Sequence, residues 1–164
     1  MHHAQASVIV KLAVLLLLFL ATSKPAVSTG IAADTVFSGI NSARIAAHLP
    51  PLRTDPVLME AAQARADELR SGSYLAHVRP NGDAFSTVLM QAAYPYQRLG
   101  ENIAAGFVAE APMVDAWLKS PSHRRNILGA ADRDIGIGVA YGIIDGIPTT
   151  ITVELVGVLQ EPIL

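Results

Sequence analysis

The chain has 164 residues, with 12 Lys+Arg against 14 Asp+Glu, and 51% of its residues are hydrophobic. This length suggests one domain, and a mean hydropathy of +0.38 with only 16% charged residues excludes a wholly disordered chain. The net charge of −2 leaves no basic excess to neutralise phosphates, which argues against a nucleic-acid partner. The absence of cysteine excludes disulfides, thiolate zinc ligands and a cysteine nucleophile.

The N-terminus has the pattern of a secretory signal peptide. An unbroken apolar run over 12–21 follows Lys11 and precedes small residues, with small-x-small cleavage sites that end at Ser23 and at Ser28. The run is shorter than the about 20 residues that a membrane-spanning helix needs. We therefore predict a signal peptide over 1–23, with cleavage as late as 28, and one domain over 34–160. The mature protein is expected to be secreted, extracellular or periplasmic, without a stable membrane span. An uncleaved N-terminal anchor is the alternative.

Helical signals dominate the first two thirds of the mature chain. Apolar spacing predicts a helix over 34–48, with Asp34 as its cap. Asp55 followed by Pro56 begins a second helix, which Gly72 ends. One face of this helix is small and apolar apart from Arg65, so another layer can approach it closely. Further helices are predicted over 83–92, with Asp83 as its cap, from 112 and over 122–128, with a short strand or loop over 102–107.

Strand signals fill the last third. Residues 134–141 alternate bulky residues such as Ile135 and Ile137 with Gly136, Gly138 and Ala140, which predicts a strand with one bulky face and one bare face. The bare face permits a helix to pack very close to the strand. A hairpin turn at 145–146 and a β-branched strand over 149–158 follow. Helices followed by such a meander predict an α+β fold in which helices cover an antiparallel sheet.

Three histidines remain after the signal peptide, and two of them have a suggestive context. His77 stands in HVRPNG, before a turn that fixes its backbone, although a lone histidine before a turn usually has a structural role. His123 begins the predicted helix of SPSHRRNIL, where the helix dipole and two neighbouring arginines disfavour imidazolium. A neutral imidazole is what a metal ligand or general base requires. His48, at a helix end, is interpreted as a surface residue.

Glu101 is the candidate carboxylate. It stands in LGENIAAG at the edge of an apolar segment, where a buried carboxylate needs partners because an unpaired one is very costly. A catalytic or binding role is one interpretation. The other is that Glu101 accepts hydrogen bonds from backbone N–H groups and holds two loops together.

Several of these segments, taken in order, resemble the CAP superfamily of cysteine-rich secretory proteins, antigen 5 and pathogenesis-related 1 proteins, also called the SCP domain. The resemblance covers nearly the whole mature chain, and the lack of cysteine is similar to the bacterial branch. It rests on NxxR from Asn41, LxxDxxL from Leu52, HVRPNG from His77, GENI from Gly100, WLKSPSHRRNIL from Trp117 and GIGV from Gly136.

The resemblance implies a three-layer α-β-α sandwich with a central antiparallel sheet and a cleft lined by two histidines and two glutamates. By motif, the histidines are His77 and His123, one glutamate is Glu101, and the second glutamate position holds Ser120. Asn102 and Arg79 are expected to line the same cleft. Some family members bind zinc through the two histidines, so the resemblance implies a weak two-histidine zinc site, since catalytic zinc usually has three protein ligands.

The leading functional prediction is a secreted protein whose cleft binds a small or peptide-like ligand, with a divalent metal such as zinc as an optional cofactor. The first alternative is a zinc-assisted hydrolase with Glu101 as the catalytic base, against which the serine at position 120 counts. The others are a lipid or sterol binding protein, and a structural module that binds a cell-wall or protein partner. The sequence leaves open whether the protein is an enzyme.

Overall fold

The computed structural model describes residues 30–90 and 95–160, so the predicted signal peptide over 1–23 lies outside the described residues. The sheet has four strands in the order β1-β3-β4-β2, and β3–β4 and β4–β2 are antiparallel pairs, whereas the two-residue β1 is parallel to β3. In chain order the elements are α2 (Ala33–Ala46), β1 (Arg53–Thr54), α3 (Pro56–Gly72), α4 (Thr87–Met90), β2 (Tyr96–Ala105), α5 (Glu110–Lys119), α6 (Pro121–Ile127), β3 (Asp134–Ile144) and β4 (Ile147–Leu159).

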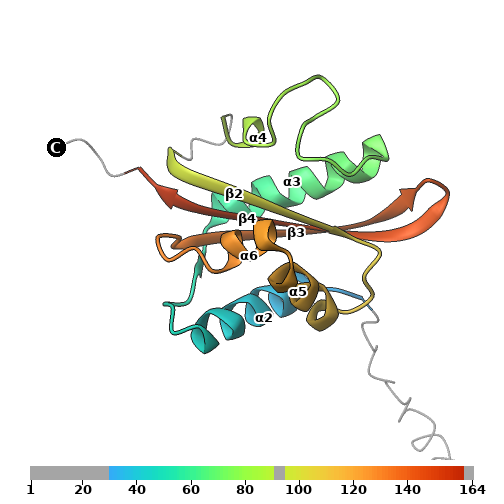
Figure 1. Cartoon of the computed structure of the whole chain (residues 1–164). Coiled ribbons are helices and arrows are strands. Elements are labelled where there is room, and N and C mark those ends of the chain that lie inside the picture. The colour runs from blue at the N-terminus through green and yellow to red at the C-terminus, as the bar shows by residue number, and fades with distance from the viewer. Residues whose placement is uncertain (1–29, 91–94, 161–164) are drawn as a thin grey trace, which may run out of the picture.

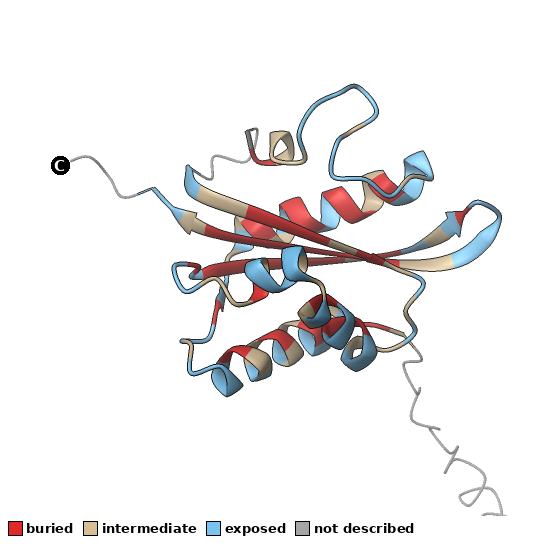
Figure 2. Ribbon diagram, in the orientation of Figure 1, coloured by how far each residue is buried: buried red, intermediate tan, exposed pale blue. Residues whose placement is uncertain are grey.

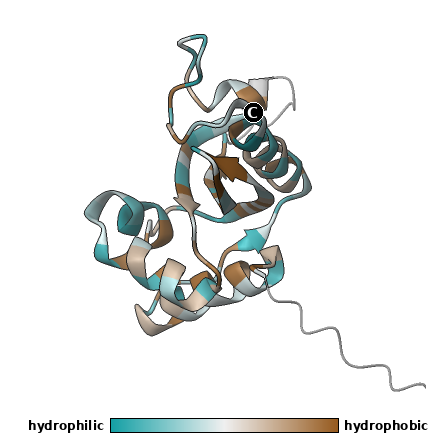
Figure 3. Cartoon of the chain, turned by 90° about the vertical axis from the view of Figure 1, so that its right-hand side faces the viewer, coloured by the Kyte–Doolittle hydropathy of each residue, from teal (hydrophilic) through white to brown (hydrophobic). Residues whose placement is uncertain are grey.

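The predicted α+β fold and three-layer sandwich are confirmed. Helices α3 and α4 lie on one side of the sheet and α2, α5 and α6 on the other (Figure 1). Buried residues follow the strands and the helix faces turned toward them (Figure 2). They form one core cluster under α2 and α5, which includes Trp117, and another under α3. A view turned by 90° shows hydrophobic strands enclosed by helices with more hydrophilic outer turns (Figure 3).

The bare face of β3 is where α3 packs, as predicted. A Cβ at Gly136 would lie 2.0 Å from the carbonyl oxygen of Leu58, and one at Gly138 would lie 2.1 Å from that of Ala62. The helix backbone therefore rests directly on the strand backbone. The helix begins as predicted, because Asp55 accepts hydrogen bonds from the amides of residues 57 and 58.

Two predicted helix caps are wrong, and two segments differ in length. Asp34 lies in the first turn of α2, whose N-cap is Ala32, so its carboxylate faces the helix dipole without capping the helix. Asp83 belongs to a turn with Asn81, and α4 is a single turn over 87–90. The segment predicted as a short strand or loop is the long strand β2, because its pairing with β4 begins at residue 96.

Within 30–90 and 95–160, no helix is long and apolar enough to cross a membrane.

Candidate functional site

The candidate site lies along β2, which carries Glu101 and Asn102 and forms one edge of the sheet. Successive side chains of a strand point to opposite faces. Glu101 therefore points toward α3, where it meets Arg65, and Asn102 points toward α6, where it meets the backbone of His123. Residues from both helical layers can thus approach one another around this edge.

Glu101 is fully buried and links two side chains of the α3 layer. Its Oε1 accepts a hydrogen bond of 2.9 Å from Nε of Arg65, and its Oε2 lies 2.7 Å from Nδ1 of His77. The side chains of Glu101 and Arg65 are both 0% exposed, whereas that of His77 is 54% exposed. Burial raises the pKa of Glu101, and the hydrogen bonds from His77 and Arg65 oppose this rise. Glu101 thus joins a residue of α3 to a residue of the following loop through side-chain donors, whereas the structural alternative had expected backbone N–H donors from two loops.

Arg65 is held so that its guanidinium faces Glu101. Its Nη1 donates to the hydroxyl of Tyr74 at 2.6 Å and lies 3.2 Å from Oε2 of Glu68, and its Nη2 donates to the carbonyl of Ala76 at 2.5 Å. A buried charge with every branch hydrogen-bonded has little freedom to move. The carboxylate of Glu101 is therefore fixed by a fully occupied partner.

His77 is positioned by the turn that follows it, as the HVRPNG sequence predicts. The amide of Phe85 donates to the carbonyl of His77 at 3.1 Å, and Gly82 adopts a left-handed φ of 88° within the turn. The Phe85 ring lies edge-on to the imidazole, with 6.4 Å between ring centroids. Because Glu101 occupies Nδ1, the ring presents Nε2 as its remaining nitrogen.

His123 reaches the site from α6. Burial lowers the pKa of His123, and the nearby His77 lowers it further. A lowered pKa supports the predicted neutral imidazole, and its causes are burial and His77, whereas the sequence pointed to the helix dipole and two arginines. Its ring lies beside the indole of Trp117, with 6.5 Å between centroids.

Helix α6 is attached to β2 by two asparagines. Nδ2 of Asn126 donates to the carbonyl of Glu101 at 3.0 Å and to Oδ1 of Asn102 at 2.8 Å, and Nδ2 of Asn102 donates to the carbonyl of His123 at 3.1 Å. A Cβ at Gly100 would lie 2.5 Å from Oδ1 of Asn126, so the glycine allows this close approach. Asn102, predicted to line the cleft, is 0% exposed and instead holds the backbone of His123.

The other two predicted cleft residues are placed less directly. Arg79 pairs with Oε1 of Glu68 at 2.9 Å and donates to the hydroxyl of Thr87, so it supports the loop beneath His77. Ser120 occupies the N-cap position of α6, but its hydroxyl lies 3.1 Å from that of Ser122 and caps no amide. Among the described residues, neither side chain forms a hydrogen bond or ion pair with His77, Glu101 or His123.

The donor set fits a metal only through its two imidazoles. Among residues 30–90 and 95–160, no three His, Cys, Asp or Glu side chains form a group that could hold a metal ion. Both oxygens of Glu101 are already engaged, which leaves this carboxylate an outer-shell position behind His77. His77 and His123 would therefore be the protein ligands, with water or a bound ligand completing the coordination.

Sequence reasoning missed two residues that build the site. Arg65 lies on the small, mostly apolar face of its helix, but nothing in the sequence pairs it with Glu101, which lies 36 positions away. Asn126 stands within SPSHRRNIL, and an amide next to an apolar residue in a short helix was the available signal. Its role depends on Gly100, and that contact is visible only in three dimensions.

Comparison with known proteins identifies similar chains. A model of the CAP family, described as the cysteine-rich secretory protein family, matches residues 37–143. An uncharacterized protein of Bacillus subtilis, YkwD, is 32% identical over 98 residues, which are 60% of this chain and 38% of that protein. The uncharacterized membrane protein YlbC of the same organism is 28% identical over 99 residues, which are 60% of this chain and 29% of that protein. The chain thus spans well under half the length of these curated relatives.

Solved structures share the fold. An outer surface protein of Borrelia burgdorferi superposes with a TM-score of 0.66 at 23% identity, over 77% of this chain and 92% of that one. An extracellular protein of Bacillus anthracis that contains an SCP domain gives 0.62 at 24% identity, over 78% and 40% of the two chains. A Schistosoma mansoni venom allergen-like protein gives 0.55 at 12% identity, over 79% and 89%. At these identities the likeness shows the fold alone.

Proposed function

Because the chain belongs to the CAP family of cysteine-rich secretory proteins, we propose that it is a secreted binding protein. Its His77–Glu101–His123 site would take a small or peptide-like ligand together with a divalent cation such as zinc. The observation that carries this proposal is the buried Glu101, which joins Arg65 to Nδ1 of His77. A carboxylate behind a histidine is the usual outer-shell arrangement of a metal-binding imidazole.

This arrangement prepares His77 as a ligand. A hydrogen bond from Nδ1–H to Glu101 selects the tautomer in which Nε2 carries the lone pair, and the carboxylate raises the basicity of that nitrogen. The exposed half of the ring can meet a ligand from solvent. The lowered pKa of His123 keeps the second imidazole neutral near pH 7, which favours a metal over a proton.

The same geometry argues against Glu101 as the base of a hydrolase. Both carboxylate oxygens are occupied, and the side chain is 0% exposed, so a water molecule has no free oxygen to approach. A bound cation would supply Lewis-acid polarisation of its ligand, while the protein residues bind and orient. We therefore favour ligand binding over hydrolysis. The lipid or sterol and structural-module alternatives stay untested predictions.

Zinc titration by calorimetry at pH 7.5 tests the metal part of the proposal. The wild-type protein should take up zinc, and His77→Ala and His123→Ala should each abolish uptake while the fold remains intact. His48→Asn is the matched control, because His48 is exposed and has a φ of 57°, which asparagine tolerates. Zinc affinity should fall below about pH 6.5, as the imidazoles protonate. A wild-type protein that takes up no zinc would remove the metal and leave a ligand-binding cleft.

Glu101→Gln separates a metal-supporting role from a purely structural one. If Glu101 orients His77 for a cation, the amide should weaken zinc affinity about tenfold or more, as for other outer-shell changes. If it serves only to neutralise Arg65, the variant should be less stable, with zinc affinity unchanged. Urea unfolding measured beside the titration distinguishes the two.

Secretion is the remaining part of the proposal. The apolar run over 12–21 supports it, and the relatives include a protein described as extracellular. N-terminal sequencing of protein recovered outside the cytoplasm should give a start between residues 24 and 29, which corresponds to cleavage between Ser23 and Ser28. Intact Met1 in membrane-pelleted material would indicate an anchor instead.

A further inference from the structure

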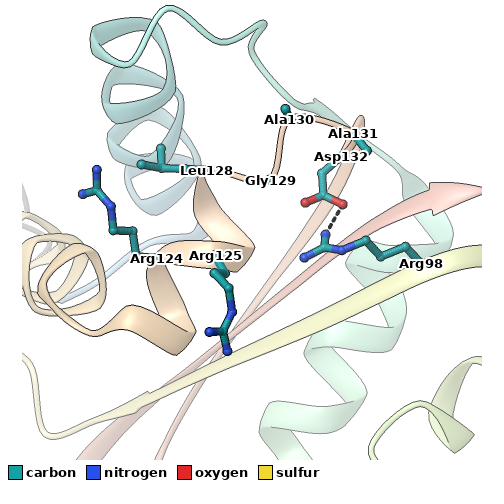
Figure 4. A pocket seen from close by; sticks show the side chains of 8 residues that line it. All are labelled: Arg98, Arg124, Arg125, Leu128, Gly129, Ala130, Ala131 and Asp132. Carbon is teal, nitrogen blue, oxygen red and sulfur yellow. Dashed lines mark hydrogen bonds and ion pairs between the residues drawn. The ribbon is translucent and has the colours of Figure 1, made fainter.

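A basic pocket lies beyond the C-terminal end of α6, apart from the contacts of His77 and Glu101. It has a volume of about 410 Å³ and lies between the end of α6, the loop 129–132 and the start of β2. Arg98 contributes from β2, Arg124 and Arg125 from α6, and Asp132 from the loop. Figure 4 shows Arg98 reaching toward Asp132, while the side chains of Arg124 and Arg125 extend from α6 on the other side of the pocket, with their guanidinium groups directed away from that pair.

The charge of this pocket is unbalanced. Three arginines and a single aspartate are among its lining residues, in a chain that is acidic as a whole. Asp132 is already paired with Nη1 of Arg98 and is 0% exposed, so it is committed to that partner. In the described part of the chain, neither Arg124 nor Arg125 forms an ion pair. Two of the arginines that line the pocket therefore have no carboxylate partner of their own among the described residues.

The basic pocket is more than a group of mobile surface charges, because Arg98 is held in a fixed position. Its guanidinium is held by the buried carboxylate of Asp132 and lies 3.4 Å from Oδ1 of Asn126. A guanidinium whose position is set in advance loses less conformational freedom when it binds an anion. Leu128, Ala130 and Ala131 add apolar surface to the lining, which suits the organic body of a ligand.

We propose that this pocket binds a small organic anion, one that carries a phosphate or a carboxylate. Guanidinium groups match both oxyanions through paired N–H donors. The volume is near the lower end of the range for ligand pockets, about 300–1,000 Å³, which fits a molecule the size of a sugar phosphate or an acylated amino acid. This proposal does not depend on metal binding at His77 and His123.

The two arginines of α6 also have a structural explanation, which must be distinguished from anion binding. Arg124 and Arg125 lie in the last turn of α6, where the helix dipole favours cations whether or not a ligand binds. That role would make their removal affect stability, with no saturable response to anions. Ligand binding would make their removal affect affinity in an otherwise stable protein, because both side chains are exposed.

The test is an NMR titration of the ¹⁵N-labelled mature protein, followed at the amides of Gly129, Ala130 and Ala131. The probes are inorganic phosphate, glucose 6-phosphate with glucose as its neutral match, and N-acetylalanine with N-acetylalaninamide as its neutral match. At least one anion should give saturable shifts, and its neutral match none. A response confined to the phosphate pair or to the N-acetylalanine pair identifies the group that is recognised.

Charge-neutral variants complete the test. Arg124→Gln and Arg125→Gln should each weaken affinity for the responding anion about tenfold, the loss of one charge-assisted contact. Arg70→Gln makes the same charge change at an exposed site on α3 and should leave affinity unchanged. The proposal is overturned if all three anions fail to give saturable shifts, if neutral matches bind equally well, or if Arg70→Gln produces the same loss.

Discussion

The two faces of the sheet differ in how well their buried polar groups are hydrogen-bonded. Helix α3 covers one face, and the layer of α2, α5 and α6 covers the other. On the α3 face, Arg65 and Glu101 satisfy each other and their neighbours. On the other face, Oδ2 of Asp132, Oγ1 of Thr152 and Oε1 of Glu154 are buried without a hydrogen-bond partner among the described residues. The charged groups on the α3 face are thus hydrogen-bonded to one another, whereas three buried oxygen atoms on the opposite face have no hydrogen-bond partner among the described residues.

The difference is also one of packing. Helix α3 rests on the glycines of β3, whereas bulky residues such as Ile135, Ile137 and Val156 fill the space on the opposite face. Close packing leaves no room for water, so the α3 face needs complete pairing. The α2 face instead holds Glu154, which burial and the nearby Asp132 keep protonated, with Asn102 and Arg44 opposing them. A neutral carboxyl costs less to bury than a charged one.

The largest effect is expected from filling the α3 interface. Gly136→Ala places a Cβ 2.0 Å from the backbone oxygen of Leu58, which cannot move without shifting the helix. We expect a loss of more than about 4 kcal/mol in the free energy of unfolding, a large part of a typical domain's stability. Urea unfolding measures it. Gly142→Ala is the control, because its Cβ meets only the flexible side chain of Arg70. Equal stability of the two variants would contradict close packing of α3.

Removing the large side chain of the opposite layer should cost somewhat less. Trp117 is 3% exposed and belongs to the core cluster under α2 and α5. Trp117→Ala should lower the free energy of unfolding by about 3–5 kcal/mol, as in other large-to-small core changes. Trp117→Phe, which keeps most of the volume, should lose clearly less. A melting temperature that alanine leaves unchanged would mean that the indole is not a core residue.

The buried carboxyl of Glu154 should make the stability of the protein depend on pH. Burial raises the pKa of Glu154 to about 8, above the usual 4.5, so the folded state binds a proton that the unfolded state has released. Its contribution to stability is therefore fully present below about pH 4.5 and is lost as pH rises toward 8, by up to about 1.4 kcal/mol per unit.

Glu154→Gln removes this titration and keeps an uncharged side chain of similar shape. The stability difference between the variant and the wild type should thus grow with pH in favour of the variant, by the order of a few kcal/mol at pH 8. Urea unfolding at several pH values between 5 and 8 tests this. A difference that stays constant with pH would mean that Glu154 is not protonated in the folded protein.

The smallest effect has the opposite sign. Gly39 lies inside α2, and a Cβ there would make an ordinary contact of 3.5 Å with Val114. Gly39→Ala should stabilise the protein by about 0.5–1 kcal/mol, since alanine favours the helix. The same substitution at Gly136, on the face covered by α3, is expected to destabilise the protein strongly. Destabilisation measured by thermal unfolding would show that the α2 layer is packed as tightly as α3.

The fold could be predicted from the sequence where a local pattern had one physical solution. The alternation of Gly136 and Gly138 with bulky residues predicted a close helix contact, and Asp55 before Pro56 predicted a helix start. At the candidate site, the turn after His77 was predicted for the same reason. These features depend on residues that are close in the sequence.

The features that the sequence did not predict are ionisable residues whose partners lie far away in the chain. Arg44 occupies the apolar stripe of α2 and is 0% exposed, and Nη1 of its guanidinium donates to the carbonyl of Ile127 at 2.7 Å, 83 positions away. Glu154 lies in a strand covered on both faces, so alternation alone could not place it inside. Arg98 and Asp132 join the start of β2 to a loop, and no motif links them.

The position of β4 determines when the core can form. This strand is the last described element, and it lies between β3 and β2, paired with both. During synthesis, α2 and α3 are made long before the strands that they cover, so neither helix has a completed sheet to bury its apolar face against. If the protein is exported as proposed, its N-terminal half would reach the export machinery before a stable core exists to obstruct its passage.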